Sequence, residues 1–188
     1  MMKPNARPQM TEAQLMAKVA PLGITRLDTL FVVGIRGYYL DTMGRAAAND
    51  RGIYDDALFV VAPDQHFSAY NGNTDPSRRR IGGGTGAGKG MACLKPGLWR
   101  AHRLGLHKGQ YRALIQTGGK VTVTRDGTPP YEDTGYFGIN IHRGGIGTTS
   151  SEGCQTIPPE QWPTFIANVD ALAKRLGVVT VPYALVLA

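Results

Sequence analysis

The chain has 188 residues, of which 42% are hydrophobic and 19% are charged, and its formal net charge is +7. This composition excludes a disordered chain, and two cysteines are too few for a disulfide scaffold. No apolar run approaches the ~18 residues that a membrane-spanning helix needs, so we expect no membrane insertion. The length favours one domain. We expect residues 1–10 to form a flexible tail and residues 11–188 to form that single domain.

The N-terminal half predicts one helix followed by strands. Residues 11–20 read as a short helix with Thr11 as its N-cap. Apolar, partly alternating runs then predict strands at 29–40 and 56–65, and the run 67–76 follows them. The last of these runs contains Asn71-Gly72, which is a hairpin signal.

The middle of the chain predicts further strands. Residues 111–127 read as a strand pair joined by Gly118-Gly119. Residues 135–142, GYFGINIH, alternate between apolar and other residues. On this pattern Ile139 and Ile141 share one face, and His142 ends the strand on the other.

The C-terminal part predicts a helix and a last strand. Apolar residues recur at helical spacing from Trp162 to Leu176, with Pro158-Pro159 before them and Gly177 after them. The run 178–187 then predicts a strand in which Pro182 marks an edge or a bulge. The expected fold is mostly β with one helix near the N-terminus and one near the C-terminus.

Two features suggest chemistry only weakly. The segment 83–90, GGTGAGKG, fits the phosphate-binding pattern G-x-x-x-x-G-K, but Gly90 replaces the Ser or Thr that holds magnesium. No buried strand precedes it and no helix follows it, so a nucleotide hydrolase is a minor alternative. The basic run 78–80 and later basic residues suit an anionic polymer, which leaves a non-enzymatic binding module as another alternative. No nucleic-acid module is recognisable, so we expect no nucleic-acid partner.

The four histidines and two cysteines also bear on cofactors. The histidines are scattered, with no HxxxH, HExxH or CxxC pair among these residues. Such pairs are the usual sequence signature of a zinc site. We therefore expect neither a metal nor another cofactor.

The stretch 139–157, INIHRGGIGTTSSEGCQTI, indicates nucleophilic catalysis. A cysteine of ordinary pKa is only about 3% thiolate at pH 7, and a nearby histidine such as His142 corrects this by taking the proton of Cys154. Gly153 permits a tight turn, and the N–H groups of Cys154 and Gly153 could bind an oxyanion. Ser151 could brace the turn through a hydrogen bond.

This stretch resembles the catalytic domain of the L,D-transpeptidase family (YkuD-type), whose signature is a histidine on a strand, a loop, and then Ser/Thr-x-Gly-Cys. The resemblance implies that Cys154 is the nucleophile and His142 its base, with Gly153 in the motif and the backbone carbonyl of Arg143 orienting the imidazole. It also implies a β-sandwich-like catalytic fold and peptidoglycan stem peptides as substrate, attacked at an L,D bond next to diaminopimelate. We expect substrate contacts from Ser151, Asn140, Gln155, Tyr136 and Arg80.

The chain departs from the family pattern at three places. Glu152 stands where many members have a histidine, and the loop from His142 to Cys154 is short. The Arg or Asn that commonly follows the cysteine and grips substrate is absent, which would leave that task to Gln155 or to basic residues such as 78–80 and Arg143.

We expect a cysteine-dependent hydrolase that cleaves stem peptides through an acyl-enzyme, as an L,D-carboxypeptidase or endopeptidase. The alternative is an L,D-transpeptidase that cross-links peptidoglycan or exchanges D-amino acids on it. The form around Cys154 resembles short, bacteriophage-encoded members such as endolysins. No signal peptide is recognisable, so we expect synthesis in the cytoplasm, with action on the cell wall after release by another route or on muropeptides within the cytoplasm. The expected partner is peptidoglycan or its muropeptides, and the expected state is a monomer.

Overall fold

The computed structural model describes residues 3–24, 29–63, 65–82 and 88–188, and in these residues the fold is mostly β with two α-helices. The helices are α1 (Glu12–Val19), which a 3₁₀ turn η1 (Ala20–Leu22) follows, and α2 (Trp162–Leu176). The strands are β1 (Phe31–Arg36), β2 (Asp56–Ala62), β3 (His66–Gly72), β4 (Ala92–Leu94), β5 (Gly97–His107), β6 (Tyr111–Gln116), β7 (Val121–Arg125), β8 (Tyr131–Gly135), β9 (Ile141–Arg143), β10 (Gln155–Ile157) and β11 (Val181–Leu187).

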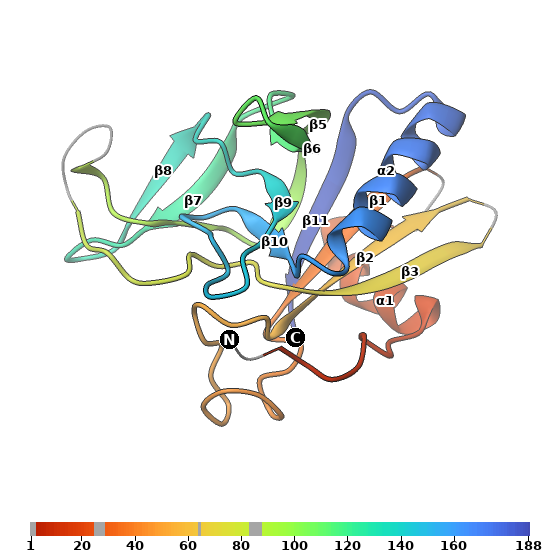
Figure 1. Cartoon of the computed structure of the whole chain (residues 1–188). Coiled ribbons are helices and arrows are strands. Elements are labelled where there is room, and N and C mark those ends of the chain that lie inside the picture. The colour runs from red at the N-terminus through yellow and green to blue at the C-terminus, as the bar shows by residue number, and fades with distance from the viewer. Residues whose placement is uncertain (1–2, 25–28, 64, 83–87) are drawn as a thin grey trace.

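The strands form one large and one small sheet (Figure 1). The large sheet has eight strands in the order β10-β9-β6-β5-β11-β1-β2-β3, and the small sheet has the order β4-β7-β8. The large sheet is mixed, because β1 pairs with β11 and β9 pairs with β10 in parallel. An isolated bridge between Asn73 and Thr156 joins the two ends of the large sheet, which is thereby nearly closed into a barrel.

The helices lie against opposite faces of the large sheet (Figure 1). Alternation along β1 explains this arrangement, because Val32 packs into the core beside α2 while Phe31 and Val33 pack into the core beside α1. On α2, Phe165 is fully buried and meets the Tyr70 ring of β3 edge-to-face at 5.2 Å. Neither helix has the length and apolarity to cross a membrane in the part of the chain that the structure describes.

Both predicted helices are confirmed. Thr11 caps α1 through a reciprocal pair of hydrogen bonds with Gln14, a capping box. Helix α2 ends at Gly177, whose φ of 65° is the left-handed conformation that glycine adopts easily. Pro182 lies at a register shift of β11 between Val181 and Tyr183, so it marks a bulge; β11 is not an edge strand, because β5 and β1 flank it.

One turn prediction is wrong. Asn71 and Gly72 do not form a hairpin turn: they continue β3 and pair with Ala57 and Asp56 of β2. Gly72 serves close packing instead, since a Cβ there would lie 2.0 Å from Leu58 Cδ1.

The run 111–127 also folds differently from the prediction. It does supply two strands, β6 and β7, but they lie in different sheets. The Gly118-Gly119 dipeptide joins the sheets while packed on another segment, because the Gly118 N–H donates to the Ala101 carbonyl at 2.8 Å.

The predicted strand 135–142 is interrupted. Its start belongs to β8 and its end to β9, and Gly138 between them has a φ of 68°. Ile139 and Ile141 are buried as predicted, and His142 lies in β9. The interruption allows the chain to leave the small sheet and enter the large one beside β10.

Candidate active site

The parallel pairing of β9 with β10 brings the predicted cysteine and histidine to one place. Register pairs Gln155 with Ile141 and Thr156 with His142. The Gln155 N–H donates to the Asn140 carbonyl at 2.8 Å, and the Asn140 N–H approaches Cys154 Sγ at 3.4 Å. Cys154, directly before β10, therefore lies beside Asn140, directly before β9.

A cavity of about 330 Å³ opens above these two strands. Cys154 and His142 both line it, together with Asn140. Its other walls come from the small sheet and its neighbouring segments, from the β5–β6 turn and from the loop between β9 and β10. The lining residues in these walls are Arg80, Lys89, Gly90, Met91, Ala92, His107, Lys108, Arg125, Phe137, Gly138, Ile139, Ser150, Glu152 and Gly153.

The Cys154 thiol is protonated at rest. It is partly buried, and Sγ donates to the Gly138 carbonyl at 3.1 Å. Burial raises the pKa of this thiol to about 11, because a low-dielectric surrounding disfavours the charged thiolate. The Asn140 N–H and the Lys108 charge act in the opposite direction on this pKa and do not overcome the effect of burial.

The His142 imidazole is held in an orientation suited to a base. The ring is 4% exposed, and Nδ1 lies 2.8 Å from the Arg143 carbonyl and 3.3 Å from the Tyr111 hydroxyl. Because a carbonyl only accepts, we assign the Nδ1 proton to the bond with Arg143, which leaves the lone pair on Nε2. Burial and then the nearby His107 lower the pKa of His142 to about 4, so the ring is neutral at pH 7.

No hydrogen bond joins the His142 ring to the Cys154 thiol among the described residues, because the thiol is directed to Gly138. The two groups share the cavity, and the thiol must leave its hydrogen bond to Gly138 before Nε2 can take its proton. Unliganded catalytic sites often have such loose hydrogen bonds.

The backbone of the cysteine loop is fixed by Gly153 and Ser151. Gly153 has a φ of 149°, and a Cβ there would lie 2.2 Å from the Ala92 carbonyl oxygen. The Ser151 hydroxyl donates to the Cys154 carbonyl at 2.7 Å and accepts from the Gly153 N–H at 3.0 Å. Ser151 is itself held by Ser77, whose hydroxyl accepts from the Ser151 N–H at 2.7 Å.

These bonds decide which N–H groups remain for an oxyanion. The Gly153 N–H, one of the two expected donors, is already bonded to Ser151. The Cys154 N–H donates to no acceptor within the described part of the chain. The Cys154 N–H is therefore the donor of this pair that can bind developing negative charge.

His107 is a site residue that the sequence did not indicate. Its ring stacks on that of His142, with 4.1 Å between centroids and 20° between planes. Asn140 connects to it, because Oδ1 accepts from the Gln116 N–H at 2.8 Å and Nδ2 lies 3.2 Å from His107 Nδ1. His107 is 35 residues before His142, so only the pairing of β5, β6 and β9 brings the rings together.

The remaining predicted contact residues divide into two groups. Asn140 and Arg80 line the cavity, and the Arg80 guanidinium lies 3.7 Å from the Glu152 carboxylate. Gln155 does not line it: its side chain is 0% exposed, donating to the Gly153 carbonyl and accepting from the Tyr183 hydroxyl, each at 3.0 Å. Tyr136, which is 60% exposed, does not line it either.

Arg143 and Ser151 take part through other contacts. The Arg143 side chain lies over the Tyr111 ring, 5.0 Å from its centroid, and only its carbonyl reaches His142. Ser151 is almost fully buried and braces the loop from behind. Neither residue is among those that line the cavity, so neither side chain is placed to touch a substrate there.

The second cysteine lies in a different environment. The Cys93 thiol donates to Asp75 at 2.9 Å, and burial raises its pKa to about 12. No group of His, Cys, Asp and Glu side chains suited to a metal ion is found in the described residues. The glycine segment 83–90 falls mostly outside them, since the structure describes only its last three residues.

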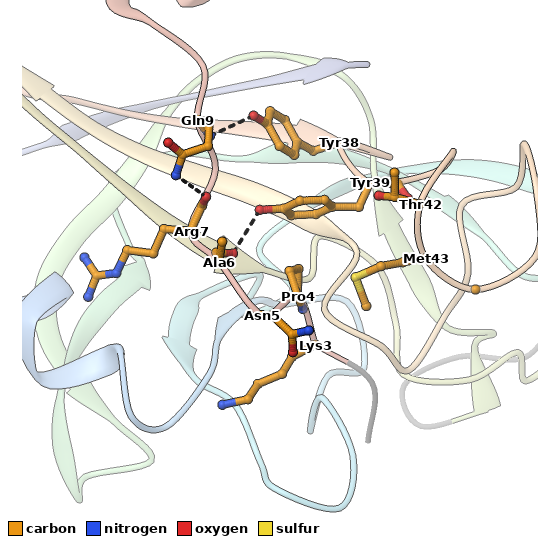
Figure 2. Close-up of a pocket in the computed structure, with 11 residues that line it drawn as sticks. Lys3, Pro4, Asn5, Ala6, Arg7, Gln9, Tyr38, Tyr39, Thr42 and Met43 are labelled. Atoms are coloured by element: carbon orange, nitrogen blue, oxygen red, sulfur yellow. Dashed lines mark hydrogen bonds between the residues drawn. The ribbon is translucent and has the colours of Figure 1, made fainter.

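A larger cavity of about 640 Å³ lies elsewhere (Figure 2). Residues 3–9 form one wall and the segment that follows β1 forms the other. The Gln9 N–H donates to the Tyr38 hydroxyl at 3.0 Å, and the Tyr39 hydroxyl donates to the Ala6 carbonyl at 3.3 Å. Among the residues that the structure describes, no His, Cys, Asp or Glu lines this cavity, so it holds no thiol and imidazole like those of Cys154 and His142.

The cavity at Cys154, in contrast, holds a thiol, an imidazole fixed through Nδ1 and an unused backbone N–H, which are the parts of a cysteine acyl-transfer site. Comparison with known proteins finds no matching family model, curated protein or solved structure. The chemistry of the site is therefore the basis for assigning a function.

Proposed function

We propose that the protein is a cysteine-dependent peptidoglycan stem-peptide hydrolase of the L,D-transpeptidase type. The observation that supports this most is that Cys154 and His142 line one cavity while the Arg143 carbonyl holds the imidazole through Nδ1. The mostly-β fold, with one helix before and one after Cys154, is compatible with a variant of the L,D-transpeptidase catalytic fold.

In the first half of the proposed reaction, His142 Nε2 takes the proton of the Cys154 thiol as Sγ attacks the scissile carbonyl. The carbonyl oxygen becomes an oxyanion, toward which the Cys154 N–H donates. The C–N bond then breaks, and the proton passes from the imidazolium to the leaving amine. The products are a free amine and a thioester on Cys154.

In the second half, His142 takes a proton from water as the water oxygen attacks the thioester. Collapse of this second tetrahedral intermediate breaks the C–S bond. The proton returns from His142 to sulfur, which restores the thiol and releases a carboxylic acid. An amine in place of water would give transpeptidation through the same thioester.

The protonation states favour general-base catalysis over a resting ion pair. A thiol pKa near 11 and an imidazole pKa near 4 both keep the pair neutral at pH 7. Proton transfer is therefore coupled to attack on the substrate. This differs from sites where an adjacent cation lowers the thiol pKa below 7 and a thiolate exists before substrate binds.

One feature favours water as the acceptor of the acyl group, and another favours the bacterial cell wall as the substrate. The loop between β9 and β10 is short, so little chain is present to cover the cysteine and hold an amine there. The net charge of +7 suits an anionic wall polymer. We therefore place the protein among cell-wall lytic enzymes, such as those that bacteriophages release.

Mass spectrometry of purified muropeptides after incubation with the protein tests this proposal. Hydrolysis products are expected with the native protein and with Cys93→Ser, but not with Cys154→Ala. A D-amino acid added as competing acceptor separates the two reactions. Exchange products in excess of hydrolysis products would replace the hydrolase by a transpeptidase, and an unchanged muropeptide pattern with native protein would contradict both.

A further inference from the structure

Lys108 occupies an unfavourable backbone position at the rim of the proposed active site. It lies in the turn between β5 and β6, which the Gln110 N–H closes by donating to the His107 carbonyl at 3.0 Å. Lys108 has a φ of 50° and Gly109 a φ of 72°. Two successive positive φ values define a turn that favours Asn, Asp or Gly at its first central position. A lysine there costs stability, which is a reason to ask what the side chain does.

Among the described residues, the Lys108 ammonium is the one cavity-lining cation without an anionic partner. Three other cations line the cavity, and each is paired: Arg80 with Glu152, and Lys89 and Arg125 both with Asp133. Lys108 is exposed and forms no ion pair with any described residue. Its charge acts on the reacting groups, because it lowers the pKa values of both His142 and Cys154.

Two side chains that were expected to contact the substrate, those of Gln155 and Arg143, are engaged with other described residues. Gln155, directly after the nucleophile, is buried beneath the loop, and its side chain is bonded to Gly153 and Tyr183. The Arg143 side chain lies over the Tyr111 ring, away from the cavity lining. Within the described part of the chain, Lys108 is therefore the cavity-lining cation that remains available to a substrate carboxylate.

We propose that the Lys108 ammonium binds a carboxylate of the substrate next to the scissile bond. This inference rests on the proposed function and names the group by which that site recognises its substrate. The carboxylate is either the terminal α-carboxylate of the peptide or a carboxylate on a side chain beside the bond. A charge-assisted hydrogen bond of this kind is among the stronger polar contacts in proteins.

Binding of a carboxylate would also change the base. The Lys108 charge disfavours a protonated His142, so an anion beside Lys108 raises the pKa of that imidazole. Substrate that carries the carboxylate would thereby make His142 a stronger base, and substrate without it would not. The carboxylate is therefore expected to affect kcat as well as KM.

Lys108→Asn tests the proposal, because asparagine suits a positive φ and removes the charge. The variant is expected to be at least as stable as the native protein in a thermal melt. Synthetic stem peptides are compared as free acid and as amide, first at the C-terminus and then at the side chain. The ratio of kcat/KM for acid over amide is expected to fall about tenfold or more at one of the two positions, which corresponds to ~1.4 kcal/mol.

Two further variants make the result specific. Lys108→Arg keeps the charge, and its ratio of kcat/KM for acid over amide is expected to stay close to that of the native protein. Lys120→Gln removes an exposed lysine between β6 and β7 that does not line the cavity, and is expected to leave the ratio unchanged. If Lys108→Asn lowers kcat/KM equally for the acid and amide peptides, so that their ratio does not change, the proposed carboxylate site is wrong.

A binding measurement separates this inference from the proposed function. Calorimetric titration of the acid and amide peptides into Cys154→Ala protein needs no turnover. The Cys154→Ala protein is compared with the double variant that also carries Lys108→Asn. Weaker binding of the acid peptide by the double variant supports the carboxylate site, even if the native protein cleaves no stem peptide. Equal binding of both forms by a protein that does cleave them overturns the carboxylate site and leaves the proposed function standing.

Discussion

The imidazole of His107 lies flat on that of His142, with 4.1 Å between the ring centroids. The two rings come from β5 and β9, with β6 between them in the sheet. Burial lowers the pKa of His107 also, so the stack is neutral at pH 7. Two imidazoles at this distance cannot both be positively charged without strong repulsion. The stack therefore favours the neutral form of His142, which is the form that a base requires.

His107→Phe is expected to move the acid limb of the kcat/KM profile to higher pH. The phenyl ring keeps the stacking but cannot carry a charge, so the pKa of His142 rises from about 4, by roughly half a unit or more. The rate at pH 5 then falls relative to the rate at pH 8. His66→Gln, which changes a histidine of β3 outside the cavity, is the matched control. An acid limb unmoved in His107→Phe would show that the stack does not govern the base.

His142→Ala and Cys154→Ala are each expected to remove nearly all turnover of muropeptides. The double variant should be within about threefold of the slower single variant, because a nucleophile without its base and a base without its nucleophile are equally inactive. Product release measured by mass spectrometry gives the three rates. If the fold-decrease in turnover of the double variant equals the product of the two single fold-decreases, the two residues act independently.

Alkylation of Cys154 is expected to be slow at pH 7 and to rise with pH until about 11. Burial raises the pKa of the thiol to about 11. Below that pH, the fraction of Cys154 in the reactive thiolate form therefore increases about tenfold per pH unit. Iodoacetamide labelling of Cys93→Ser protein, followed by mass spectrometry, measures this thiol alone. A rate that has already levelled off at pH 7 would instead indicate a resting thiolate–imidazolium pair.

Gly153→Ala is expected to lower the free energy of unfolding by about 1–3 kcal/mol and to abolish turnover. The φ of Gly153 is 149°, and a Cβ at this position would lie 2.2 Å from the Ala92 carbonyl oxygen, so an alanine does not fit. Gly147→Ala in the same loop is the control. No atom lies within 4 Å of a Cβ at that position, and its change is expected to stay within about 0.5 kcal/mol. Denaturant unfolding measures both variants, and equal losses would contradict the argument.

Cys93→Ser is expected to retain turnover within about twofold of native. The serine hydroxyl can donate to Asp75 as the thiol does, and the residue does not line the cavity. Steady-state hydrolysis of muropeptides measures the effect. A folded Cys93→Ser protein without activity would mean that the wrong thiol has been assigned as the nucleophile.

Local patterns were sufficient to predict the helices. Apolar spacing and capping residues such as Thr11 and Gly177 act within a few turns of the chain, so they are readable from sequence. Strand β5 was not predicted, because exposed charged residues such as Arg100 and Arg103 break its apolar alternation. The sheet membership of β6 and β7 depends on long-range pairing that no local pattern contains.

The site could be predicted only in part for the same reason. Cys154, His142, Gly153 and Ser151 lie within one short stretch, and Ser151 braces the loop as its position suggested. His107 and Lys108 reach the cavity through strand pairing, so nothing near Cys154 in sequence points to them. The expected substrate contact of Gln155 fails because all three residues of β10 are buried, and its side chain bonds to Gly153 and Tyr183 inside the protein.

The bridge between Asn73 and Thr156 has a consequence for how firmly the cysteine is held. Thr156 exchanges two backbone hydrogen bonds of 2.8 Å with Asn73, while Gln155 and Ile157 bond to the segment around β9 on the other side. The three-residue strand β10 thus has partners along both sides and offers no open edge to another chain. Its amide protons should exchange with solvent as slowly as those of the central strands. In a proteolysis experiment, cleavage within β10 itself should then require this strand to separate from its neighbours on both sides.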